Sequence, residues 1–171
     1  PGTFVVGEDE ILEHELVSGV TYSRDEAKIT LLRVADRPGI AAGIFGPLAD
    51  ASINVDMIVQ NISAEGDTTD ITFTVSKSDL ERARAVIEAS RETITYARLL
   101  SDPNVVKVSV IGVGMRSHAG IASKMFHTLA EKGINIQVIS TSEIKVSVLI
   151  DEAYTELAVR ALHTAYGLDA H

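Results

Sequence analysis

Cysteine and tryptophan are absent from the sequence, and no uninterrupted apolar run approaches the ~20 residues needed to cross a bilayer. Without cysteine, the chain cannot form disulfide frameworks, thiolate nucleophiles or cysteine-rich zinc sites. The five histidines are scattered, with no HxxxH-like pair. The N-terminus also lacks the basic and then apolar pattern of a signal peptide. We therefore expect a chain that has neither a metal site nor a membrane partner.

Basic residues are few relative to acidic ones: 15 Lys and Arg stand against 24 Asp and Glu, which gives a formal net charge of −9. This balance argues against nucleic-acid binding, which relies on clustered basic side chains. With 171 residues, of which 46% are hydrophobic, the chain can bury a core in one ordinary domain or two small ones. It begins with Pro1 rather than methionine, and we expect it to be a piece of a longer protein.

One stretch of the sequence occurs twice, at an offset of 81 residues. Gly39-Ile40-Ala41 corresponds to Gly120-Ile121-Ala122, and nine of the twenty positions from Gly39 to Ile58 are identical in the second copy. Self-similarity at a fixed period is typical of duplicated structural units. The sequence therefore predicts a tandem duplication of a unit of roughly 75–80 residues.

The first copy alternates strand and helix patterns. Residues 29–34 form a β-branched run that ends in the turn Asp36-Arg37-Pro38-Gly39, and residues 40–48 have helical spacing. Strand patterns at 55–62 and 71–75, an amphipathic helix at 80–87 and a closing strand at 94–100 follow, so the predicted order is βαββαβ. Pro47 predicts a kink or an early end of the first helix. Ser101-Asp102-Pro103 is interpreted as a linker.

The second copy has no fourth strand of its own. It offers strands at 105–111, 136–141 and 145–150 and helices at 119–132 and 154–166, and then ends. Because a spare strand pattern lies at 16–21, we predict that this strand completes the second sheet. The predicted organisation is a segment 1–26, a first unit 27–102 and a second unit 103–171. The fold class is α+β, with ferredoxin-like units whose antiparallel sheets carry helices on one face.

The candidate functional residues lie where the first strand of each unit meets its first helix. At Asp36–Gly39, free N–H groups of a helix N-terminus and a small glycine favour a carboxylate or a phosphate. A plain Pro-Gly turn in which Asp36 caps the helix is the alternative. Asn54 and Asp56 begin the second strand, and could meet the loop of another, paired unit. For Asn54 the alternative is an ordinary turn residue.

Two other patterns carry less weight. Gly112-Val113-Gly114 begins like a dinucleotide fingerprint, but the third glycine and the ribose-binding acid are missing, so we reject that function. His118 has no identifiable Ser or Asp partner and is interpreted as a loop histidine. The charges at Glu81, Arg82 and Glu92 predict a solvated helix face.

Tandem βαββαβ units with a loop of small residues before the first helix resemble ACT domains, the amino-acid-sensing modules of biosynthetic enzymes. The strings 56–63, 68–74, 114–118 and 139–148 resemble the regulatory region of aspartate kinases more narrowly. Ala119 departs from the proline that many members carry there. The match covers the chain from about Ser18 onward, and residues 1–15 then resemble the junction that leaves a catalytic domain.

The resemblance implies an allosteric regulatory region that binds threonine, lysine or both and controls the phosphorylation of L-aspartate by ATP. The partners implied are a second copy, as a homodimer through ACT–ACT contacts, and the catalytic domain or subunit, in the cytoplasm. The chain itself is expected to hold no catalytic residue and no cofactor, because the ATP and Mg²⁺ of the parent kinase would bind elsewhere. A stand-alone double-ACT regulator that acts through a partner protein is the alternative.

Carried onto this sequence, the resemblance implies two effector sites. The first site consists of Asp36, Gly39, Ile40, Ala41, Asn54, Val55, Asp56 and Gln60. The second site consists of Met115, Gly120, Ile121, Asn135, Ile136, Ser140 and Thr141. Since Gln137 stands where the first unit has Asp56, we expect the second site to be weaker or to bind a different ligand.

Overall fold

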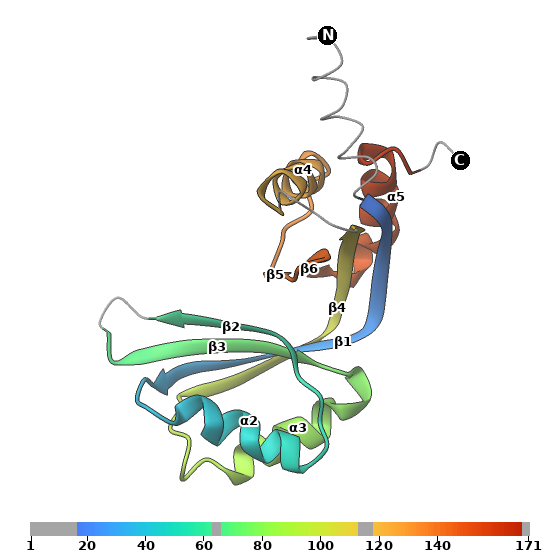
Figure 1. Cartoon of the computed structure of the whole chain (residues 1–171). Helices are drawn as coiled ribbons and strands as arrows, with labels where there is room; N and C mark the ends of the chain where they lie inside the picture. Colours follow the sequence, from blue (N-terminus) through green and yellow to red (C-terminus); the bar gives the residue numbers. More distant parts are fainter. Residues whose placement is uncertain (1–16, 63–65, 113–117, 169–171) are drawn as a thin grey trace. The chain divides into compact units, whose positions relative to one another are not determined.

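The computed structural model describes residues 17–62, 66–112 and 118–168 (Figure 1). Met115, one of the predicted site residues, lies outside these ranges. The elements, in chain order, are β1 (Val17–Ala35), α2 (Ile40–Asp50), β2 (Asp56–Ile62), β3 (Thr68–Val75), α3 (Leu80–Ala89), β4 (Arg98–Gly112), α4 (His118–Glu131), β5 (Val138–Thr141), β6 (Lys145–Asp151) and α5 (Thr155–Ala165). One-turn 3₁₀ helices at Lys77–Asp79 and Glu152–Tyr154 precede α3 and α5. None of the described helices has the length and apolar character to cross a membrane.

The described residues divide into two units. Residues 25–105 form the first unit, and residues 17–24 together with 106–168 form the second. The strand order is β2-β3-β1-β4 in the first unit and β5-β6-β4-β1 in the second. In each unit both helices cover one face of the sheet (Figure 1). The predicted α+β class with two ferredoxin-like repeats is therefore confirmed.

The core of the first unit lies between its sheet and α2 and α3. Alternate residues of β1, namely Ala27, Ile29 and Leu31, are fully buried, as expected of a strand with one face on the core. Phe73 of β3 is also fully buried and meets Phe45 of α2 edge-on, with ring centroids 5.2 Å apart. Burying a side chain of this size contributes about 1.5–3 kcal/mol, so this layer of apolar contacts holds the helices on the sheet.

The second unit repeats this arrangement with a different chain path. Val106, Val108 and Val110 of β4 pack with Met125 and Leu129 of α4 in its core. Val17, at the start of β1, is buried in the same core, and Val20 packs against it. The beginning of β1 therefore supplies the strand that the end of the chain lacks.

The strand boundaries differ from those predicted. We expected separate strands at 16–21 and 29–34, but β1 runs without a break over 19 residues. The predicted linker Ser101-Asp102-Pro103 is likewise wrong, because these residues lie inside β4. Proline fixes φ near the extended range and removes only one donor, so it is compatible with a strand wherever its N–H is not needed.

The early end predicted for the first helix at Pro47 is also wrong. α2 continues past Pro47 to Asp50, which is the repeat position of Glu131, where α4 ends. The two helices differ instead at their N-termini, because α2 begins after Gly39 whereas α4 already includes His118 and Gly120. The glycine of the repeated Gly-Ile-Ala motif therefore precedes one helix and lies inside the other.

Candidate functional site

The loop that follows β1 is anchored at three points within the first unit. The backbone N–H of Ala35 donates to the Thr95 carbonyl at 3.0 Å, and that of Asp36 donates to the Asp67 carbonyl at 3.1 Å. The Arg37 guanidinium donates from Nη2 to the Thr93 carbonyl at 2.7 Å. The sequence did not single out Arg37, because its partner lies 56 residues away. This loop is consequently held between the β2–β3 hairpin and the segment before β4.

The N-terminus of α2 has no side-chain cap, although its Ile40 N–H donates to the Arg37 carbonyl at 3.2 Å. Gly39 is the N-cap with φ 88°, a left-handed conformation that favours glycine, and no side chain caps this end of the helix. The Asp36 side chain is exposed and does not cap the helix, so the alternative of a simple capped turn is not what the structure shows. Ile40 is buried, whereas Ala41 is exposed. Helix N–H groups without a side-chain cap favour an anion such as a carboxylate.

Asp56, at the start of β2, has a structural task of its own. Its Oδ1 accepts a hydrogen bond from the Met57 N–H at 2.9 Å, and its carbonyl accepts one from the Thr74 hydroxyl at 3.1 Å. Met57 is held at φ 47°, in the left-handed region, beside a register shift between β2 and β3. The Asp56 carboxylate thus stabilises an irregular strand start, which sequence reasoning did not reveal.

The strand register separates the predicted first site into two groups. Asp56 pairs with Thr74, which pairs with Lys28 of β1, whereas Ile62 pairs with Thr69, which pairs with Val34. The six residue-to-residue steps from Lys28 to Val34 span roughly 20 Å at ~3.3 Å per step. Asn54, Val55 and Asp56 therefore lie at the opposite end of the unit from Asp36, Gly39 and Ala41. Gln60 lies in the half of β2 that leads to the hairpin at Asp67.

The second unit has the same separation. Ser140 and Thr141 pair with Ser147 and Val146 near the β5–β6 turn, and the Gly112 N–H at the end of β4 donates to the Ile144 carbonyl in that turn at 2.8 Å. Asn135 and Ile136 precede the other end of β5. They are consequently not brought together with Ser140 and Thr141 inside one unit.

The first turn of α4 is pinned from the C-terminal end of the chain. Ile121 is buried, and its carbonyl accepts a hydrogen bond from the Tyr166 hydroxyl at 2.6 Å. The Lys124 ammonium lies 5.4 Å from the centre of the same ring. Gly120 is a helical residue here rather than a cap. The two helix N-termini are therefore built differently, although their sequences are repeats.

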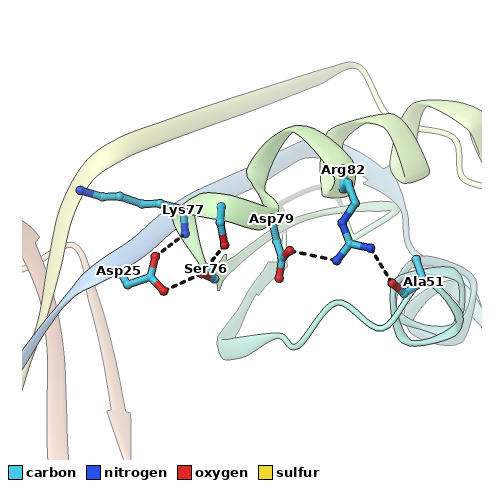
Figure 2. Close-up of polar contacts among 7 residues, drawn as sticks. Asp25, Ala51, Ser76, Lys77, Asp79 and Arg82 are labelled. Atoms are coloured by element: carbon cyan, nitrogen blue, oxygen red, sulfur yellow. Dashed lines mark hydrogen bonds and ion pairs between the residues drawn. The ribbon is translucent and has the colours of Figure 1, made fainter.

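A polar network holds the helix pair of the first unit (Figure 2). Asp25 of β1 accepts hydrogen bonds from the Ser76 hydroxyl at 2.6 Å and from the Lys77 N–H at 3.1 Å. Arg82 of α3 donates to Asp79 and to the Ala51 carbonyl, both at 2.9 Å, and so links α3 to the end of α2 (Figure 2). The predicted solvated face is therefore not purely solvated. The described residues contain no cluster of His, Asp or Glu that could hold a metal ion.

Comparison with known proteins identifies the family. The ACT domain pattern matches residues 33–90 and again residues 108–166. The chain belongs to the ACT domain family. Each ACT match falls largely within one of the two structural units, so the tandem ACT arrangement implied by the sequence strings is confirmed.

The relatives of this tandem ACT chain are aspartate kinases. An aspartate kinase of Pseudomonas putida is 53% identical over 171 residues, which are 99% of this chain and 41% of that protein. An aspartokinase of Corynebacterium glutamicum is 44% identical, over 98% of this chain and 41% of its own length. The chain thus spans about two fifths of the length of the curated relatives it matches.

Solved structures show which part of those proteins this ACT chain resembles. A chain from the crystal structure of aspartokinase alpha and beta subunits has 50% identity and a TM-score of 0.83, over 88% of this chain and 99% of that chain. The regulatory subunit of aspartate kinase from Thermus thermophilus has 39% identity and a TM-score of 0.82, over 88% of this chain and 98% of that subunit. The chain therefore corresponds to the regulatory ACT region of aspartate kinases.

Proposed function

We propose that this ACT chain is the amino-acid sensor of an aspartate kinase, and that threonine, lysine or both bind to it and inhibit the phosphorylation of L-aspartate by ATP. The observation that carries the proposal is the uncapped N-terminus of α2 behind Gly39, with the exposed carboxylate of Asp36 beside it in the same loop. A free amino acid carries a carboxylate and an ammonium group. The N–H groups of the helix can bind its carboxylate, and the Asp36 carboxylate can bind its ammonium group. ATP and Mg²⁺ would bind to the catalytic part, in the cytoplasm, and no cofactor is proposed for this chain.

A complete site needs two ACT units. Asp36, Gly39 and Ala41 lie at one end of the first unit, and the strand-start residues Asn54 and Asp56 lie at the other, so no single unit can assemble both groups. β2 and β5 are the terminal strands of the strand order. Antiparallel pairing of such edges would bring the loop end of one unit to the strand-start end of another. This geometry supports a homodimer through ACT–ACT contacts.

Within such a site, the roles of the side chains can be separated. We assign the ligand carboxylate to the N–H groups of the first turn of α2, and the ligand ammonium to Asp36. Asp56 is the weaker candidate for the ammonium, since its Oδ1 already accepts from the Met57 N–H. Gln60 then contacts the ligand of the first site. In the second site, Gly120, Ile121, Ser140 and Thr141 form the loop end, and Asn135 and Ile136 form the strand-start end. Met115 is proposed for the second site from the sequence alone.

Regulation follows from linkage between effector binding and the state of the kinase. An effector that binds the inhibited arrangement more tightly by about 1–3 kcal/mol lowers activity about 5–150-fold. The effector needs no contact with ATP or aspartate. Its only requirement is that pairing of the ACT units differs between the active and the inhibited state.

The test is calorimetric titration of the chain with threonine and with lysine. Asp36→Asn should weaken binding by about tenfold or more, because it removes a charge-assisted contact. Asp50→Asn is the matched control: Asp50 is an exposed residue at the other end of α2 and its change should leave the affinity unaltered. Absence of saturable binding of either amino acid at millimolar concentration would overturn the proposal for this chain.

The alternative is a stand-alone double-ACT regulator that acts through a partner protein. One observation bears on it: this chain covers 98% of a separate regulatory subunit but only 41% of the curated relatives. The catalytic part can therefore be proposed either as a fused domain or as a subunit. Reconstitution of the chain with an aspartate kinase catalytic subunit distinguishes the two proposals. Effector-dependent inhibition of that subunit favours the proposal that the chain regulates an aspartate kinase.

A further inference from the structure

A cavity of about 350 Å³ lies within the second unit, away from the proposed effector residues. Its volume is within the range of sites for small ligands. β1 and α5 form its walls, and the side chains used below are Tyr22, Arg24, Thr155, Glu156, Arg160 and His163. We refer to it as the α5 cavity. None of these residues belongs to either proposed effector site.

The α5 cavity has more basic than acidic side chains, in a chain whose net charge is −9. Its lining includes the guanidinium groups of Arg24 and Arg160 and the carboxylate of Glu156. Among the described residues, neither Arg160 nor His163 forms an ion pair or a side-chain hydrogen bond. Within the described ranges, the Arg24 guanidinium carbon lies 5.8 Å from the centre of the Tyr22 ring. Neither arginine of the cavity is thus neutralised by a carboxylate of the described residues.

The corresponding helix of the first unit lacks this charge pattern. α3 and α5 align at an offset of 75, since each follows a one-turn 3₁₀ helix and buries equivalent positions. Arg160 and His163 then correspond to Ala85 and Glu88. The nearest arginine of α3, Arg84, pairs with Glu81 at 3.5 Å. The positive cavity is thus a property of one unit and not of the ACT repeat.

We propose that the α5 cavity binds a small phosphate-bearing anion. Guanidinium groups present paired N–H donors that match phosphate oxygens, and two of them line this cavity together with the imidazole of His163. Thr155 supplies no donor to the anion, because its backbone N–H and its hydroxyl, the latter at 2.7 Å, both donate to the Glu152 carbonyl. The Tyr22 ring, whose side of the cavity is half exposed, offers a surface to an organic group attached to the phosphate. This inference does not rest on the proposed amino-acid sensing.

The experiment is an NMR titration of the full chain with inorganic phosphate at constant ionic strength. Saturable shifts of amides in 22–24 and 155–163 are expected. Arg160→Gln should weaken the affinity about tenfold, and Glu156→Gln should strengthen it about threefold, because it removes the opposing charge. Lys145→Gln is the matched control: Lys145 begins β6 of the same unit and lines neither the α5 cavity nor the neighbouring pocket that Arg160 also borders, and its change should have no effect.

The outcomes separate binding in the cavity from general attraction. Shifts that do not saturate, or an equal loss in the Lys145 variant, overturn the proposal. If Arg160→Gln perturbs folding, two other variants test the proposal. Arg24→Gln should weaken phosphate binding, and Glu156→Gln should strengthen it. A parallel titration with adenosine diphosphate distinguishes an organic phosphate from the free ion. If adenosine diphosphate binds more tightly than phosphate, and Tyr22→Leu abolishes this advantage, the ligand is an organic phosphate. If the two bind equally, the ligand is the free ion.

Discussion

The two ACT units share one strand order but obtain it by different paths along the chain. The first unit is a continuous segment, 25–105, whereas the second takes its edge strand from residues 17–24 and the rest from 106–168. Their cores also differ: Phe73 meets Phe45 edge-on in the first, whereas in the second Val148 takes the place of Phe73, and Phe126, the repeat of Phe45, packs against the core. The comparison shows that the repeat conserves where elements lie, not what fills or caps them.

The largest predicted effect concerns these cores. Phe73→Ala should cost about 3–5 kcal/mol of unfolding free energy, and its counterpart Val148→Ala only about 1.5–3 kcal/mol. Both side chains are fully buried or nearly so, so the difference reflects side-chain size and the lost contact with Phe45. Denaturant unfolding of the two variants measures it. Equal losses would show that the aromatic pair adds nothing to the first unit.

A second difference lies in a duplicated pair of hydroxyls between strands. Ser109 and Ser147 are buried with their oxygens 2.6 Å apart, and the equivalent Thr30 and Thr72 are 3.2 Å apart and half-buried. Ser109→Ala should cost about 2 kcal/mol, since it leaves the Ser147 hydroxyl buried without its partner. Thr30→Val should cost about 0.5 kcal/mol or less.

The double variant Ser109→Ala/Ser147→Ala is the control for this pair. Removing both hydroxyls together leaves no unsatisfied group, so it should be more stable than either single variant. Thermal or denaturant unfolding gives all four values. The explanation would be wrong if the double variant lost the sum of the two single losses.

A third prediction compares two buried tyrosines. Tyr166 donates to the Ile121 carbonyl, whereas no hydrogen-bond partner for the buried Tyr96 hydroxyl exists among the described residues. Tyr166→Phe should cost about 1.5 kcal/mol, and Tyr96→Phe should leave stability unchanged or raise it by up to about 1 kcal/mol. Unfolding curves of the two variants check the signs. A loss in Tyr96→Phe as large as that in Tyr166→Phe would contradict the contrast.

The smallest predicted effect is at the repeated glycine. Gly39→Ala should cost about 1 kcal/mol, because alanine disfavours φ 88°. Gly120→Ala, inside α4, should be neutral or stabilise by up to about 1 kcal/mol, since alanine is the better helix former. Circular dichroism during unfolding measures both. The same sign in both variants would mean that the two glycines do not differ as the structure shows.

The sequence was most informative about patterns that repeat locally. The repeat at an offset of 81 and the spacing of apolar residues within each copy predicted two ferredoxin-like units. Each strand or helix pattern can be read from residues a few positions apart. The continuous strands β1 and β4 were not predicted, because Ser101-Asp102-Pro103 has the composition of a loop and only pairing with neighbouring strands makes it extended. Tertiary context overrides weak local propensity in such segments.

The candidate site shows the same limit. Asp36 and Gly39 could be recognised from the turn and the helix start, since these signals are local. That Asp56 lies at the other end of the unit, and that its carboxylate supports Met57 at φ 47°, depends on register and on a bulge. Neither leaves a signature in the one-dimensional pattern. The role of Arg37 was hidden for the same reason, because it bonds Thr93 across a long stretch of chain.

The path of β1 and β4 has a consequence for how such proteins can be built. The chain enters the first unit along β1 and returns along β4, and these strands are neighbours in the sheet. The segment from Asp25 to Val105 is therefore an insertion whose two ends lie in a pair of neighbouring strands. Loss of this segment would require only a short turn between the two strands, and exchange for another segment would leave the remaining unit unchanged.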